Sequence, residues 1–277
     1  MSDSGTSPAE PRKIPFWRTI FQSFRFVFIN LHRVVTIGWL PFIIIAVGSY
    51  VAIANMVGYA TFSATITIPV QILSWLAYAV FAVCWHRFVI LGEQRIGAAG
   101  LLTWRNVIFF GYFAVLVALP VFAMTRSNQY IIFATQQNSP TMWVLIAYVL
   151  SFVAVIVYFI LFRFYLLFPA TAIDRPLKLG EAWRRMRGNT WRLIGATFLV
   201  AIIFTAPLIP PNIHLGELMT EAATAKAQGI SFEASLPAYV IVMPVLYFLM
   251  TGVLITVLSN TYLHIMGASQ HEAADAS

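Results

Sequence analysis

Charged residues are scarce in this chain. They make up 10% of its 277 residues, whereas about 25% is usual in a soluble globular domain. Hydrophobic residues account for 60%, and the mean hydropathy is +0.81. This composition excludes an ordinary soluble domain and is typical of a polytopic helical membrane protein. Because apolar segments occupy most of the length, the sequence predicts no separate soluble catalytic domain.

Cysteine and catalytic motifs are also rare or missing. Cys84 is the single cysteine and lies in an apolar run, so we expect a buried thiol and no intramolecular disulfide. The motifs of serine hydrolases, zinc peptidases and nucleotide-binding loops do not occur. His86 and His264 have no second histidine or carboxylate at ligand spacing. The sequence therefore predicts a non-enzymatic protein with no metal and no cofactor.

Acidic residues are missing from the apolar segments. All ten Asp and Glu residues fall outside them. Proton- and cation-coupled transporters commonly place a carboxylate at membrane depth, so this pattern disfavours such a mechanism. Prolines do lie in or beside the apolar segments, and ordinary helix kinking is favoured over the broken helices of transporter binding sites. These prolines are Pro41, Pro69, Pro120, Pro207 and Pro244.

Six apolar segments are long enough to cross the hydrocarbon core, which takes about 20 residues. We predict spans near residues 34–57, 66–91, 107–124, 142–168, 193–209 and 238–265. With the segment that precedes the first span, they form one all-α membrane domain at 13–267. Residues 1–12 are predicted to be a disordered tail, and residues 268–277 a polar C-terminal tail.

Lys and Arg are distributed unevenly between the two sides of the predicted bundle. Fifteen of the seventeen lie on the side of the N-terminus, and only Arg126 and Lys226 lie on the other. The positive-inside rule then predicts that both termini are cytoplasmic. The net charge of +7 is explained by basic loops facing anionic lipid, so lipids are the predicted partners and nucleic acid is not.

Two basic segments have the pattern of surface helices. In 13–33, apolar residues recur at helical spacing, namely Ile14, Trp17, Phe21, Phe24 and Phe28. This predicts a helix in the membrane interface, and the alternative is the cytoplasmic start of the first span. The segment 163–192 carries seven Lys and Arg residues. Within it, Leu179, Ala182, Trp183 and Met186 share one helical face, which predicts a short helix on the inner leaflet.

Two further features of the loops carry expectations. Asp174 and Glu181 are expected to pair with neighbouring arginines of the central segment. On the opposite side, residues 210–237 are predicted to form the longest loop, with a short helix at 217–228.

Five arginines are candidates for contacts with lipid headgroups. Arg87 and Arg163 each stand at the end of a predicted span, where the stem is buried and the guanidinium reaches the headgroups. Binding of a substrate is the alternative for these two. Arg184, Arg185 and Arg187 belong to the predicted surface helix, where either general anchoring or specific binding of an anionic headgroup fits. Protein partners and the oligomeric state are left open.

Two stretches carry a resemblance to a known group. WHRFVILGE at 85–93 and FPATAIDRPLKLGEAWRRMRGNTWRL at 168–193 resemble bacterial six-span inner-membrane proteins. That group is similar to the membrane domain found beside some glycerophosphodiester phosphodiesterases and to the YciC-like family. The resemblance covers residues 17–267 and implies a plasma-membrane location without an activity. We expect no phosphodiesterase activity from this sequence, because Phe88 follows His86-Arg87 where the motif of that domain has glycine.

The sequence thus favours an integral inner-membrane protein that organises the membrane or envelope or interacts with lipid. The alternative is a transporter of small solutes or lipids, which predicts a polar cavity at mid-membrane reaching Arg87, Arg163 or Asn260. An intramembrane enzyme is the least favoured class, because catalytic groups are missing.

Overall fold

The chain is mainly helical in the part that the structure describes. The computed structural model describes residues 13–57, 62–92, 103–124, 141–228 and 237–275, and no strand occurs among them. The elements are α1 (Phe16–Ile29), α2 (Leu31–Val57), α3 (Ala64–Leu91), α4 (Trp104–Phe113), the π-helical η2 (Ala114–Ala118), α6 (Thr141–Leu161), the 3₁₀ turn η3 (Phe162–Phe164), α7 (Leu167–Ala172), α8 (Leu179–Arg185), α9 (Thr190–Thr205), the 3₁₀ turn η4 (Ala206–Leu208), α10 (Ile209–Ala227) and α11 (Pro237–Asp275).

Six helical stretches of the described chain are long and apolar enough to cross a membrane. They are Leu31–Asn55, Thr65–Leu91, Trp104–Met124, Val144–Phe164, Thr190–Ala222 and Val242–Gly267. Their number and order confirm the predicted all-α polytopic fold. The predicted tail at 1–12 lies outside the described residues.

Three predicted boundaries differ from the structure. The span predicted at 142–168 ends earlier, because α6 stops at Leu161 and the chain turns through η3 into α7. The segment 210–237, predicted as a loop with one short helix, is helical instead as far as Ala227, because it continues the 19-residue α10 that starts at Ile209. The segment 268–277, predicted as a tail, extends α11 as far as Asp275. Hydropathy locates the apolar part of a helix, whereas residues such as Ala, Glu and Leu continue it into polar surroundings.

Helices α2, α3 and α11 pack against one another at the centre of the bundle. A glycine allows the close approach, since a Cβ at Gly38 of α2 would lie 2.5 Å from the ring of Phe248 on α11. Phe248 packs in turn on Phe81 of α3, with ring centroids 4.3 Å apart. Small residues that admit a close neighbour are typical of membrane helix packing, where lipid removes the usual hydrophobic drive between helices.

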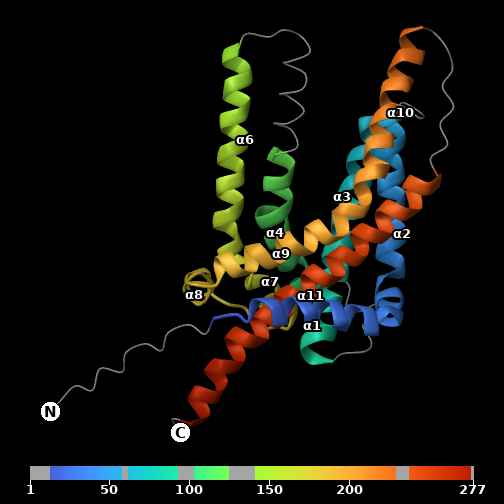
Figure 1. Ribbon diagram of the computed structural model, residues 1–277. Helices are drawn as coiled ribbons and strands as arrows, with labels where there is room; N and C mark the ends of the chain where they lie inside the picture. The colour runs from blue at the N-terminus through green and yellow to red at the C-terminus, as the bar shows by residue number, and fades with distance from the viewer. Residues whose placement is uncertain (1–12, 58–61, 93–102, 125–140, 229–236, 276–277) are drawn as a thin grey trace.

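Helix α1 lies across the ends of the other helices (Figure 1), and a turn at Asn30 separates it from α2. Its inner face buries Ile20, Ser23 and Val27, and the helix contacts α9 and α11. Trp17 is 60% exposed on the outer side. The chain therefore has a separate helix before the first span, as the interfacial interpretation predicts. The predicted face is divided: Trp17, Phe21 and Phe28 are exposed, whereas Ile14 is buried and Phe24 stacks on Phe204 of α9.

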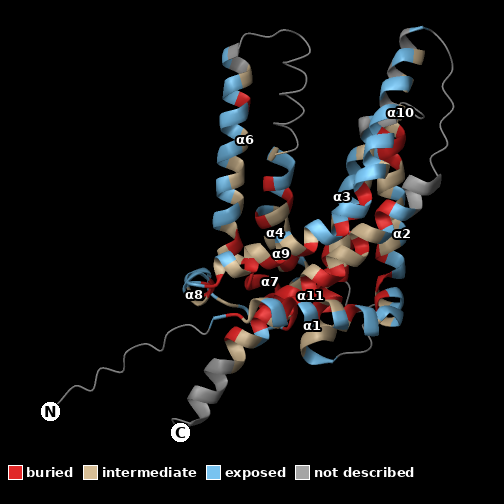
Figure 2. Ribbon diagram, viewed as in Figure 1, coloured by how far each residue is buried: buried red, intermediate tan, exposed pale blue. Residues whose placement is uncertain are grey.

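Apart from Lys226 on α10, the Lys and Arg residues of the described chain gather at one end of the bundle. They lie on residue 13 and α1, the first turn of α2, the last turns of α3, the first turn of α4, and the segment from η3 to the start of α9. We call this the basic end; α11 also finishes here (Figure 1). Figure 2 shows that buried residues concentrate toward the same end, around α7 and the crossing of α1 with α11, whereas α6 is exposed along most of its length.

Candidate functional site

The structure separates Arg87 from the other candidate arginines and gives it protein partners. Its Nη1 donates to Oδ2 of Asp174 and to the carbonyl oxygen of Ala172, both at 2.9 Å. Arg105 donates its Nε to the other carboxylate oxygen of Asp174 at 2.6 Å. The side chain of Arg87 is 15% exposed. Arg87 thus joins α3 to the end of α7, and this geometry favours a structural role over a headgroup contact.

Helix α8 carries two of the four remaining candidates, Arg184 and Arg185, and a third, Arg187, follows it directly. Arg185 is partly buried and pairs with Glu181 one turn earlier, at 2.8 Å. Arg184 and Arg187 are exposed. The face predicted to be apolar is divided, since Ala182 and Met186 are buried whereas Leu179 and Trp183 are exposed. The expected pairing of Glu181 is confirmed, and Asp174 pairs with arginines far from it in the sequence rather than with neighbours.

The turn between α8 and α9 is held by the start of the described chain. Gly188 has a φ of +80°, in the left-handed region that glycine adopts without a steric cost. The buried side chain of Asn189 accepts a hydrogen bond from the backbone N–H of Ile14 at 2.8 Å. Arg192 donates to the carbonyl oxygen of Ile14 at 2.6 Å. These contacts fix the position of α9 relative to α1.

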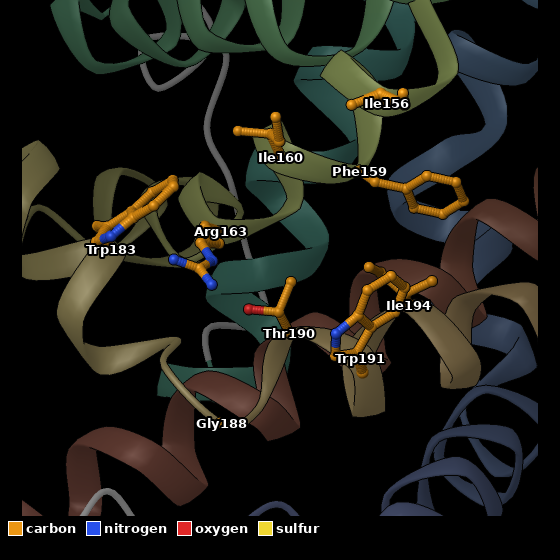
Figure 3. A pocket seen from close by; sticks show the side chains of 9 residues that line it. All are labelled: Ile156, Phe159, Ile160, Arg163, Trp183, Gly188, Thr190, Trp191 and Ile194. Atoms are coloured by element: carbon orange, nitrogen blue, oxygen red, sulfur yellow. The ribbon is translucent and has the colours of Figure 1, made fainter. Parts of the chain in front are cut away.

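A groove of about 450 Å³ opens between α6, α8 and α9 at the basic end (Figure 3). We call it the Arg163 groove. It is lined by Ile156, Phe159, Ile160, Arg163, Trp183, Gly188, Thr190, Trp191 and Ile194. It brings together Arg163, a predicted headgroup contact, with Trp183 and Trp191, and the sequence did not predict that these three side chains lie beside one another.

The Arg163 groove combines one cation with apolar walls. The guanidinium carbon of Arg163 lies 4.1 Å from the centre of the Trp183 ring, a cation–π contact. Within the described part of the chain, the guanidinium has no carboxylate partner. Thr190 adds a hydroxyl to the lining. On the apolar side, the ring centroids of Trp191 and Phe159 lie 6.2 Å apart. The arrangement suits an anion that is attached to an apolar group.

A second space, which we call the central cavity, lies between the helices of the bundle. It has a volume of about 490 Å³, is bordered by α3, η2, the region from α6 to α7, α9 and α11, and is about as open to the outside as the Arg163 groove. Its lining is mainly apolar and includes none of Arg87, Arg163 and Asn260. Asn260 instead donates to Ser23 of α1 at 3.0 Å. Among the described residues, this cavity is not the polar one that the transporter alternative predicts.

Tyrosine hydroxyls are among the few polar groups on the wall of the central cavity. Tyr165 follows η3 at the basic end and lies beside Tyr158. Burial raises the pKa of Tyr165 well above its usual value, and Tyr158 contributes to the shift.

Two buried hydrogen bonds join α3 to α11, and sequence reasoning missed both. Trp85 donates its Nε1–H to Thr256 at 2.8 Å, and Nδ1 of His86 lies 2.7 Å from the Ser259 hydroxyl. The sequence feature that could have indicated them is the three-residue spacing of Thr256 and Ser259, which puts both hydroxyls on one face of α11. Cys84, next to this pair, is buried as expected. No group of three or more His, Cys, Asp or Glu side chains that could hold a metal occurs in the described chain.

Fold and groove together define the class as a polytopic helical membrane protein with an amphipathic groove at its basic end. Comparison with protein-family models, curated proteins and solved structures gave no match. The resemblance to six-span inner-membrane proteins stays a prediction.

Proposed function

We propose that this protein is a non-enzymatic lipid-binding protein of the bacterial inner membrane, with both termini in the cytoplasm. In this proposal the Arg163 groove holds the phosphate of an anionic phospholipid. The observation that carries the proposal is the guanidinium of Arg163, which rests on the Trp183 ring without a described carboxylate partner. A cation left available at the end of an apolar helix is suited to a headgroup.

The chemistry of the groove supports this choice of ligand. Arginine presents several N–H donors in a planar fork that matches a phosphate, and hydrogen bonds to ionised groups are the stronger kind. Tryptophan is enriched at the membrane–water interface, where Trp183 and Trp191 would lie in this orientation. The apolar side of the groove, formed by Ile156, Ile160 and Ile194, continues toward the hydrocarbon and accommodates the start of an acyl chain.

The surroundings of the groove add to the attraction for anionic lipid. Arg184 and Arg187 are exposed and lie close to Trp183 in the sequence, on and just after α8. Each basic residue near an anionic surface contributes about 1 kcal/mol of attraction. Because the Lys and Arg residues of the described chain, apart from Lys226, gather at this end of the bundle, the positive-inside rule assigns it to the cytoplasm. Among the described residues, no His, Cys, Asp or Glu lines the groove, which is consistent with binding rather than catalysis.

The test compares lipid retention by variants of the full chain. Purified protein is mixed with equal amounts of phosphatidylglycerol and phosphatidylcholine, and bound lipid is counted by native mass spectrometry. We expect Arg163→Ala to bind about tenfold less phosphatidylglycerol, as loss of one charge-assisted contact implies. Arg163→Lys keeps the charge but loses the planar fork, so an intermediate loss is expected.

The matched control is Arg25→Ala, which removes an exposed arginine of α1 at the same end of the bundle. General surface attraction predicts equal losses for Arg25→Ala and Arg163→Ala, and that outcome would contradict a specific headgroup site. Equal retention of the two phospholipids by the unaltered protein would contradict it as well.

A further inference from the structure

The polar atoms on the wall of the central cavity indicate what it binds. Two threonine hydroxyls on the wall donate their protons within their own helices, Thr197 to the carbonyl of Leu193 and Thr251 to the carbonyl of Tyr247. Their oxygen atoms can therefore only accept further hydrogen bonds. The wall offers acceptors in an otherwise apolar surrounding, together with tyrosine hydroxyls that either accept or donate.

His86 supplies the strongest of these acceptors. Its side chain is 1% exposed and belongs to the wall of the cavity. Ser259 has one hydroxyl proton, which it donates to the carbonyl of Ile255 at 2.9 Å. With this proton assigned to Ile255, as is common for a serine inside a helix, Nδ1 of His86 is the donor in the 2.7 Å contact with Ser259. In the neutral ring this leaves Nε2 as an acceptor, and the described chain gives it no protein partner.

The ligand must be uncharged. Within the described chain, no Lys, Arg, Asp or Glu side chain lines the central cavity. A buried charge without a partner costs several kcal/mol, so a phosphate or a carboxylate is excluded here. A buried acceptor without a donor costs about 1–3 kcal/mol, which a hydroxyl group of a ligand relieves. The volume of about 490 Å³ lies within the range of about 300–1,000 Å³ that is usual for small-molecule pockets.

We propose that the central cavity binds a neutral single-chain lipid that carries a hydroxyl group, the class of long-chain alcohols and monoacylglycerols. The chain lies along the apolar wall, and the hydroxyl donates a hydrogen bond to Nε2 of His86. This site is separate from the Arg163 groove and does not depend on it. The groove takes an anion at the basic end of the bundle, whereas the cavity takes an uncharged lipid inside it.

The test uses the full chain in phosphatidylcholine nanodiscs with a photoreactive probe. The probe is oleyl alcohol with a diazirine in its chain, and the comparison probe is its methyl ether, which has no donor. Labelled peptides are mapped and measured by mass spectrometry. We expect label on cavity-lining peptides of α3 and α11, about tenfold stronger with the alcohol than with the ether. In His86→Phe the two probes should label equally, since Ser259 keeps its bond to Ile255 while the acceptor is lost.

Two variants that replace an alanine by phenylalanine distinguish labelling inside the cavity from labelling of any surface exposed to lipid. Ala118→Phe fills the cavity from η2 and should reduce cavity labelling about tenfold. Ala52→Phe adds the same ring at an exposed position of α2 and should leave labelling unchanged. If Ala118→Phe does not yield folded protein, Ala82→Leu fills the same cavity from α3.

Two results overturn the proposal: cavity labelling that both filling variants leave intact, or equal labelling of the unaltered protein by alcohol and ether. Arg163→Ala should not change the labelling. The cavity and the groove are therefore tested independently.

Discussion

The carboxylate of Asp174 lies 2.9 Å from Nη1 of Arg87, although 87 positions separate the two residues. Arg105 donates to the same carboxylate, so one acidic side chain joins the ends of two helices to the segment after α7. Asp174 also has a φ of +59°, which few residues other than glycine, asparagine and aspartate adopt. Asp174 thus supplies the negative charge that pairs with both arginines, and it also adopts the left-handed backbone conformation after α7.

Replacement of Asp174 separates these two contributions. Asp174→Asn keeps a side chain that tolerates the left-handed backbone but removes the charge, and should lower the free energy of unfolding by about 1 kcal/mol, because the carboxylate is half exposed. Asp174→Ala adds the cost of a positive φ, for about 2 kcal/mol in total. Thermal unfolding in detergent measures both. The exposed Glu221→Gln of α10 serves as the control and should not change the midpoint.

Gly38 sets the distance between α2 and α11. A methyl group there would meet the ring of Phe248 at 2.5 Å, so Gly38→Ala should destabilise the bundle by about 1–3 kcal/mol. Gly111 of α4 has open space around it, and Gly111→Ala should be neutral or slightly stabilising because alanine favours the helix. Thermal unfolding of the two variants provides the comparison. Equal midpoints would show that the contact with Phe248 relaxes without cost.

Trp183 orients Arg163 in the groove. Trp183→Leu keeps an apolar side chain but removes the ring under the guanidinium, and should weaken retention of phosphatidylglycerol about threefold, since an exposed cation–π contact contributes about 0.5–1 kcal/mol. Trp183→Phe should lose less. The matched control is Trp17→Leu, which removes an exposed tryptophan of α1. A similar loss in Trp17→Leu would mean that tryptophan acts by general interfacial anchoring.

The orientation can be measured with introduced cysteines, because Cys84 is buried and should give no background. Thr220→Cys on α10, at the end opposite to α8, should react with a membrane-impermeant maleimide in intact spheroplasts. Arg187→Cys should react only after the membrane is permeabilised. The reverse pattern would place the basic end outside and remove the basis for a cytoplasmic headgroup site.

The candidate arginines show how far sequence reasoning reached. It selected Arg163 and the α8 arginines because a cation at the end of an apolar run must stay near water. By the same criterion it selected Arg87, which the fold pairs with Asp174 instead. The two arginines end their apolar runs with the same pair of letters, Arg-Phe. The tertiary positions of Asp174, after α7, and of Trp183, on α8, decide that one guanidinium meets a carboxylate and the other an indole ring.

The sequence by itself determined three features of this protein: its membrane surroundings, its six apolar helices and the gathering of most of its Lys and Arg residues on one side. These are properties of local composition: the length of an apolar run and the count of Lys and Arg do not depend on which helices touch. The tertiary structure decided the burial of α7, the hydrogen bond of His86 with Ser259 and the contact of Arg163 with Trp183. Such contacts arise where helices cross, and helices that are apolar on all sides carry no periodic signal of which face will meet which neighbour.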